Sequence, residues 1–279
     1  MTLSRSRYYA VGGYELHVTE WGDAASPALV MWHGLARTGR DFDILASHFS
    51  NRYRVICPDT LGRGLSSWSA APDTDYTLDA YMIHAERLLD IMGIEGLTWI
   101  GTSMGGALGM LLAAGPLRDR IRRLVVNDIG PTLNPAAVER IRSYVTQSPD
   151  FAGMAEFEGF LRLVYKPYGQ LSDEEWCRMA ESSARRRDDG RITVHYDPDV
   201  MRVFAASAGA YEIWPAWDAI TCPVLALRGA QSDLLLPEVA EEMTRRGPKA
   251  RLVTVPGCGH APALNIPAQI RLIDDFLEG

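Results

Sequence analysis

The chain has 279 residues, of which 47% are hydrophobic, and its formal net charge is −7. This is enough apolar sequence for one substantial core, with room for a smaller lobe attached to it. No basic face stands out, because the arginines at 185–187 are followed at once by two aspartates. We therefore do not expect nucleic acid as a partner.

The N-terminal sequence and the cysteines favour a cytoplasmic protein. Residues 1–18 contain no long apolar stretch of the kind that an export signal needs. No apolar run reaches the ~18 residues of a membrane helix, so we expect no contact with a membrane. The four cysteines lie far apart, as is usual in a reducing compartment. The six histidines lack the spacing of metal ligands, so we expect no metal site.

Strand-like and helix-like segments alternate along most of the chain. Residues 15–21 alternate between apolar and polar side chains, as an edge strand would. Short apolar runs bounded by turn residues are typical of strands buried on both faces, and they lie at 28–34, 54–59, 97–103, 123–130, 223–229 and 251–257. Helical patterns separate them, at 40–49, 77–92, 104–114, 237–246 and 264–277. This alternation predicts an α/β fold with a mostly parallel, doubly wound sheet.

One segment, residues 131–215, breaks this rhythm, and we call it the insertion. It shows helical patterns and no convincing buried strand, and Asn134 and Ser172 have the sequence context of helix N-caps. We therefore predict a core domain made of residues 1–130 and 216–279. The insertion is expected to form a helical cap, or lid, between two strands of the core sheet.

The most informative stretch is "GTSMG" at residues 101–105, where a strand-like run meets a helical pattern. A serine on so tight a bend needs neighbours without side-chain bulk, which explains the glycines at 101 and 105. The following helix begins directly after Ser103, so its first backbone N–H groups point at whatever the serine attacks. A strand, an elbow and a helix in this order are the context that the G-x-S-x-G pattern requires.

A bare serine is a poor nucleophile, so it needs a base within hydrogen-bond reach and a group that orients the base. His260 follows a predicted strand and precedes the last helix, which makes it the candidate base. Asp233, just past another strand, is the candidate acid. Asp128 also ends a predicted strand and is the alternative acid, although it could instead bind backbone N–H groups where the chain enters the insertion.

Five segments together resemble the α/β-hydrolase family, namely "HGLARTG" (33–39), "DTLGRGLS" (59–66), "GTSMGG" (101–106), "RGAQSD" (228–233) and "GCGHAP" (257–262). They span nearly the whole chain in the family's order. Within the family, the sequence is similar to small, cap-bearing carboxylesterases. The resemblance implies Ser103 as nucleophile, Asp233 as acid and His260 as base, while some relatives place their carboxylate at the position of Asp128.

The resemblance also implies an oxyanion hole made by the backbone N–H groups of Leu35 and Met104. Two such donors stabilise the charge that acyl transfer builds on the substrate oxygen. His33 is expected to brace the turn before Leu35 rather than to take part in catalysis. Asp59 matches a family turn that supports the site without doing chemistry.

The sequence thus predicts a serine hydrolase that cleaves carboxylic esters of small to medium apolar groups through an acyl-enzyme, without a metal or organic cofactor. Apolar side chains of the insertion are expected to form its own core and to line a pocket above Ser103; they are Phe157, Phe160, Leu161, Val164, Tyr165, Tyr168, Trp176, Phe204, Tyr211 and Trp214.

Several other functions remain as alternatives. Hydrolysis of lactones, thioesters or the carbon–carbon bond of diketones uses similar triads, although "HGLARTG" lacks the glycine-rich loop usual in the last group. A non-enzymatic sensor on the same scaffold is the alternative from another class. Ser103 argues against dehalogenases and epoxide hydrolases of this fold, because these carry an aspartate at the elbow.

Overall fold

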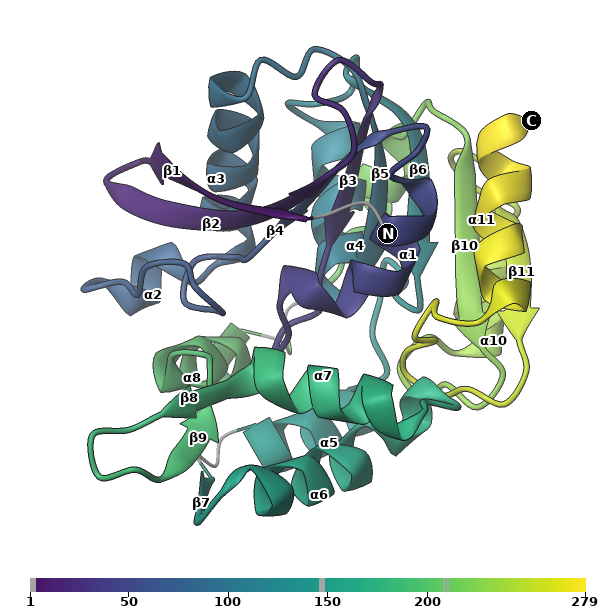
Figure 1. Ribbon diagram of the computed structural model, residues 1–279. Helices are drawn as coiled ribbons and strands as arrows, with labels where there is room; N and C mark the ends of the chain where they lie inside the picture. The colour runs from purple at the N-terminus through teal and green to yellow at the C-terminus, as the bar shows by residue number, and fades with distance from the viewer. Residues whose placement is uncertain (1–3, 146–148, 208, 210) are drawn as a thin grey trace.

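The protein is built around one large sheet, shown in Figure 1. The computed structural model describes residues 4–145, 149–207, 209 and 211–279. The sheet has eight strands in the order β1-β2-β4-β3-β5-β6-β10-β11. Their bounds are β1 Arg5–Val11, β2 Tyr14–Trp21, β3 Ala28–Trp32, β4 Arg54–Pro58, β5 Leu97–Thr102, β6 Ile121–Asn127, β10 Val224–Gly229 and β11 Arg251–Val255. From β4 to β11 every neighbouring pair is parallel, so the predicted mostly parallel sheet is confirmed.

The start of the sheet differs from the prediction. Residues 15–21 do form a strand, but β2 pairs antiparallel with both β1 and β4, so it is not an edge strand. The edge strand at this end of the sheet is β1, which the sequence analysis did not predict. Most side chains of β1 are exposed on both faces, so this strand lacks the apolar run or alternation that identifies the others.

Helices cover both faces of the sheet (Figure 1). One face packs against α1 and α11, and the other packs against α3, α4, α9 and α10. The bounds are η1 Gly39–Phe42, α1 Asp43–Phe49, α2 Pro72–Asp75, α3 Leu78–Ile91, α4 Met104–Ala114, α9 Trp214–Ala219, α10 Pro237–Met243 and α11 Pro267–Glu278. The five helices predicted for the core are therefore present. With both faces covered, the central strands are buried throughout, which explains their continuous apolar runs.

Most of the chain between β6 and β10 forms a layer at one end of the sheet, drawn in teal and green in Figure 1. Its helices are α5 Pro135–Val145, α6 Met154–Val164, η2 Lys166–Tyr168, α7 Asp173–Ser183 and α8 Pro198–Ser207. The predicted N-caps are present, because the side chain of Asn134 accepts from Ala136 N and that of Ser172 accepts from Glu175 N. That this layer is a domain of its own stays a prediction.

A small sheet inside this layer corrects the expectation that the insertion contains helices alone. Its three strands have the order β7-β9-β8 and the bounds β7 Asp150–Phe151, β8 Ala184–Arg186 and β9 Ile192–Val194. Strands of two or three residues are too short to show an alternating pattern, so sequence periodicity could not reveal them.

Candidate active site

The strand β5 and the helix α4 meet at Ser103 in a very tight elbow. Ser103 has φ 52° and ψ −118°, in a region that residues other than glycine rarely adopt. The neighbouring strand holds this conformation, because Ser103 N donates to the carbonyl of Asn127 at the end of β6 over 2.9 Å. At the other side, Gly106 N and Ala107 N both donate to Ser103 O. The elbow thus places the serine hydroxyl at the carboxyl edge of the sheet.

The two glycines of the elbow allow three backbone segments to touch. A Cβ atom on Gly101 would lie 2.1 Å from the carbonyl oxygen of Gly105, and one on Gly105 would lie 2.0 Å from that of Trp32 in β3. No side-chain rotation relieves these clashes, because both partners are backbone atoms. The glycines are therefore required by packing, as the G-x-S-x-G pattern predicts.

We expect Gly105→Ala to lower the free energy of unfolding by about 3 kcal/mol or more, because β3 or α4 must move to admit the methyl group. Gly159→Ala is the matched control, since Gly159 lies inside helix α6 with nothing within 4 Å of its Cβ position. That change should leave stability equal or raise it by up to about 1 kcal/mol. Urea unfolding of both variants measures the difference, and equal stability of the two would contradict the packing argument.

His260 reaches Ser103 from the loop between β11 and α11. Its Nε2 lies 2.9 Å from Ser103 Oγ, and its Nδ1 lies 2.8 Å from Asp128 Oδ2. A carboxylate only accepts hydrogen bonds, so we assign the proton to Nδ1, and Nε2 is then free to accept from the serine hydroxyl. This is the arrangement in which an imidazole acts as a general base towards a serine.

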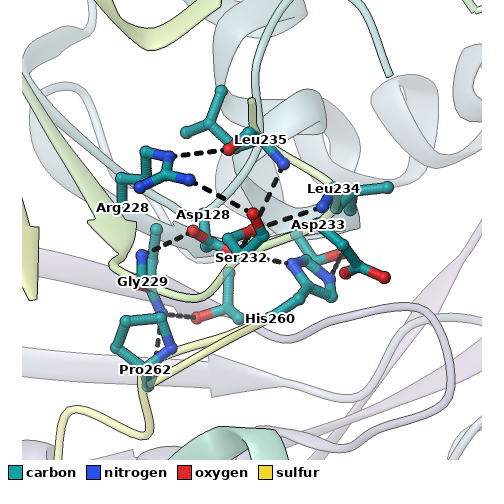
Figure 2. A network of polar contacts seen from close by, with 12 residues as sticks. Asp128, Arg228, Gly229, Ser232, Asp233, Leu234, Leu235, His260 and Pro262 are labelled. Atoms are coloured by element: carbon teal, nitrogen blue, oxygen red, sulfur yellow. Dashed lines mark hydrogen bonds and ion pairs between the residues drawn. The ribbon is translucent and has the colours of Figure 1, made fainter. Parts of the chain in front are cut away.

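Asp128 is completely buried at the end of β6, and neighbouring groups fix its carboxylate. Oδ1 accepts from Gly229 N over 2.7 Å, and Oδ2 accepts from Ser232 Oγ over 2.6 Å as well as from His260. Figure 2 shows this network with the loop from Arg228 to Leu235 wrapped around it. A buried carboxylate with this many donors is held in one orientation.

The structure corrects the placement of Asp233, which the sequence analysis expected beside His260. Its carboxylate instead pairs with Arg140 of α5, at 2.6 Å between Asp233 Oδ2 and Arg140 Nε, and the Asp233 side chain is 45% exposed. The physical reason lies in the loop after β10. The buried guanidinium of Arg228 donates to the carbonyls of Ser232 and Leu235, which turns Ser232 inward and Asp233 outward.

Sheet order explains why Asp128 stands where Asp233 was expected. Strand β6 lies directly between β5, which carries Ser103, and β10. The residue that follows β6 is therefore adjacent to the elbow, and Asp128 N is fixed there by a 2.8 Å hydrogen bond to Leu227 O. Asp128 also accepts from Gly229 N, so it makes a backbone contact of the kind that the sequence analysis gave as its alternative role.

The residues expected to supply the oxyanion donors line the same cavity as Ser103. The backbone N–H groups of Leu35 and Met104 have no acceptor among the described residues, and both residues line the cavity that contains Ser103 and His260. Met104 is the first residue of α4, where helix N–H groups lack a partner within the helix. The two expected donors are therefore available at the wall of the cavity that contains the hydroxyl.

His33 braces the turn that carries Leu35, as expected. Thr60 N donates to His33 Nε2 over 2.9 Å, so the proton lies on Nδ1, which donates to Gly34 O over 2.7 Å. Burial lowers the pKa of His33 to about 4, with the nearby carboxylate of Asp59 opposing this shift. The imidazole therefore stays neutral near neutral pH and keeps both hydrogen bonds.

Arg37, which sequence reasoning missed, ties this turn to the insertion. Its backbone N donates to Gly34 O over 3.2 Å, and its buried guanidinium donates to Asp41 and, over 2.9 Å, to Ser183 Oγ at the end of α7. The ring of Tyr165 lies 4.7 Å from the guanidinium carbon. An arginine in a loop motif is usually expected at the surface. Arg37 is buried because the insertion packs over it, which the sequence alone does not show.

A cavity of about 390 Å³ opens above Ser103, between the sheet and the insertion. Of the insertion residues considered for this role, Val164, Tyr165, Tyr168, Phe204 and Tyr211 line it. Phe157, Leu161 and Trp176 are instead buried in the hydrophobic core. Phe160 packs against Phe151 with the two rings tilted, and the guanidinium of Arg246 lies over the ring of Trp214. The space is of the size and largely apolar character of sites for small molecules.

Neither a metal site nor a membrane-spanning helix is found within the residues that the structure describes. Among them, no group of three or more His, Cys, Asp or Glu side chains is arranged to hold a metal ion. Within the same residues, no helix has the length and apolar character needed to cross a membrane.

Comparison with known proteins agrees with this architecture. A family model described as the alpha/beta hydrolase fold matches residues 27–265. The chain belongs to the α/β-hydrolase family. A crystal structure of an alpha/beta hydrolase from Novosphingobium aromaticivorans is 38% identical, with a TM-score of 0.90 over 100% of this chain and 99% of the other.

The names of two curated relatives of this α/β hydrolase state the substrate that each relative hydrolyses. The 3-hydroxybutyrate-oligomer hydrolase of Cupriavidus necator is 40% identical, in an alignment that covers 96% of this chain and 94% of the relative. The 2-(acetamidomethylene)succinate hydrolase of Mesorhizobium japonicum is 25% identical, over 96% of this chain and 95% of the relative.

Proposed function

We propose that this α/β hydrolase cleaves carboxylic esters through an acyl-enzyme formed on Ser103. The observation that carries the proposal is the continuous chain of hydrogen bonds from Ser103 Oγ through His260 to Asp128. In this mechanism Ser103 is the nucleophile, His260 the general base and Asp128 the acid that orients it.

Acylation follows from this geometry. His260 Nε2 takes the hydroxyl proton while Ser103 Oγ attacks the ester carbonyl, and the negative charge on the carbonyl oxygen is stabilised by the N–H groups of Leu35 and Met104. The imidazolium so formed is stabilised by Asp128 and then protonates the leaving alcohol. The ester C–O bond breaks, and the acyl group stays on Ser103.

Deacylation repeats these steps with water. His260 removes a proton from a water molecule that attacks the acyl carbonyl, and Ser103 regains its proton as the carboxylic acid leaves. One ester and one water thus give one acid and one alcohol. No step requires a metal or an organic cofactor.

The lining of the cavity supports an ester with small to medium apolar groups. Leu35, Ile129, Leu133 and Phe204 are among the apolar side chains around it. The name of the relative from Cupriavidus necator makes oligomers of 3-hydroxybutyrate, which are chains of short ester units, the first natural substrates to test. Lactone and thioester hydrolysis remain the alternatives, because the same triad would serve them.

A panel of substrates tests this proposal. We expect p-nitrophenyl butyrate and the dimer and trimer of 3-hydroxybutyrate to be hydrolysed, with a p-nitrophenol burst of about one equivalent where deacylation is slow. Matched oxoester, thioester and lactone substrates compare the alternatives by kcat/KM. Higher kcat/KM for the thioester or the lactone would favour that alternative, and no turnover of any member would contradict the proposal.

A further inference from the structure

The charged residues of the cavity suggest which part of a substrate, besides the scissile bond, the enzyme recognises. Arg140 lines the same cavity as Ser103, and its guanidinium forms a fork on the carboxylate of Asp233. The two distances are 2.6 Å from Nε to Oδ2 and 2.9 Å from Nη2 to Oδ1. The guanidinium is therefore already oriented to bind a carboxylate.

Arg140 differs from Arg37, the other arginine that lines the cavity. The guanidinium of Arg37 is enclosed by Asp41, Ser183 and Tyr165, and its side chain is only 2% exposed. The side chains of Arg140 and Asp233 are 42% and 45% exposed, so a ligand can reach this pair. Exchange of one carboxylate for another at such a site costs little, because exposed ion pairs contribute little to stability.

The loop after β10 connects this pair to the hydrogen bonds around His260. Asp233 directly follows Ser232, whose hydroxyl binds Asp128, and Asp128 in turn binds His260. The next residue, Leu234, lines the cavity. Arg140 therefore contributes to the wall of the cavity that also contains Ser103 and His260. In the proposed mechanism His260 is the residue that gives the leaving alcohol its proton.

We propose that Arg140 binds a carboxylate on the alcohol part of the ester, by exchange with Asp233. The inference rests on the proposed function and narrows its substrate class to esters whose leaving group is a hydroxy acid. When the ester C–O bond breaks, His260 supplies the proton to the alkoxide, and the departing hydroxy acid keeps its carboxylate on Arg140. Once the product has left, the carboxylate of Asp233 pairs with the guanidinium of Arg140 again.

The test compares two substrates that differ only in this charge. The probes are the linear dimer of 3-hydroxybutyrate and the same dimer with its terminal carboxylate replaced by a carboxamide. The quantity measured is the ratio of kcat/KM for the acid to kcat/KM for the amide. In wild type we expect this ratio to exceed one, and in Arg140→Gln we expect it to fall by about tenfold.

Two further variants make the test specific. Asp233→Asn removes the competing carboxylate and should raise the ratio by about threefold. Arg142→Gln removes a positive charge from the same helix at a residue that does not line the cavity, so it should leave the ratio within twofold. A fall of at least threefold in Arg140→Gln, absent from Arg142→Gln, supports the proposal. A smaller fall, an equal fall in both variants or a wild-type preference for the amide overturns it.

Failure of this inference can be told apart from failure of the proposed function. Hydrolysis of p-nitrophenyl butyrate, which has no carboxylate, reports on Ser103 chemistry alone. If wild type cleaves that ester but the acid-to-amide ratio is the same in wild type and Arg140→Gln, the esterase mechanism stands and only the carboxylate subsite is rejected. A preference for an ester with a cationic leaving group would point instead to Asp79 and Glu212, which also line the cavity.

Discussion

Asp128→Asn is expected to lower kcat for ester hydrolysis by about 10⁴-fold. The amide can donate a hydrogen bond to His260 Nδ1, which favours the tautomer with its proton on Nε2. That tautomer cannot accept the proton of Ser103. Burial of Asp128 adds to the effect, because no water can replace the lost carboxylate.

Asp233→Asn is the matched control for this prediction, because it makes the same chemical change at the rival acid. With a neutral ester such as p-nitrophenyl butyrate, its kcat should stay within a few-fold of wild type. Steady-state kinetics of both variants, with circular dichroism to show that both are folded, decides between the two carboxylates. An active Asp128→Asn enzyme beside an inactive Asp233→Asn enzyme would return the catalytic acid to position 233.

Ser103→Ala should lower kcat by about 10⁶-fold, the largest effect expected of any single change. The variant loses the nucleophile but keeps the N–H groups of Leu35 and Met104, so a residual rate above that of water should remain. Its stability should be close to that of wild type, because alanine also has a Cβ atom and meets the same positive φ at the elbow.

Covalent labelling separates this chemistry from a contaminating esterase. A fluorophosphonate should label wild type at one serine, found by mass spectrometry at position 103, and should leave Ser103→Ala unlabelled. His260→Ala should be labelled far more slowly, because the hydroxyl then lacks its base. Equal labelling of wild type and Ser103→Ala would place the reactive group elsewhere and reject the mechanism.

The sequence by itself determined most elements of the core and the position of the proposed nucleophile. Strands buried on both faces carry continuous apolar runs, and an elbow that brings three backbone segments into contact leaves no room for a Cβ atom at positions 101 and 105. These are local requirements, so they leave a local signature. His260 was found in the same way, from its place on a loop between a strand and the last helix.

Only the tertiary structure decided which carboxylate faces the imidazole. Asp128 and Asp233 both follow strands, and nothing in the residues next to them shows which one contacts His260. The order of strands in the sheet places β6 beside the elbow, and Arg228 turns Ser232 inward while Asp233 faces out to Arg140. Which residues of the insertion line the cavity depends in the same way on packing between segments far apart in the chain. Such contacts are set by the whole fold, so no short stretch of sequence records them.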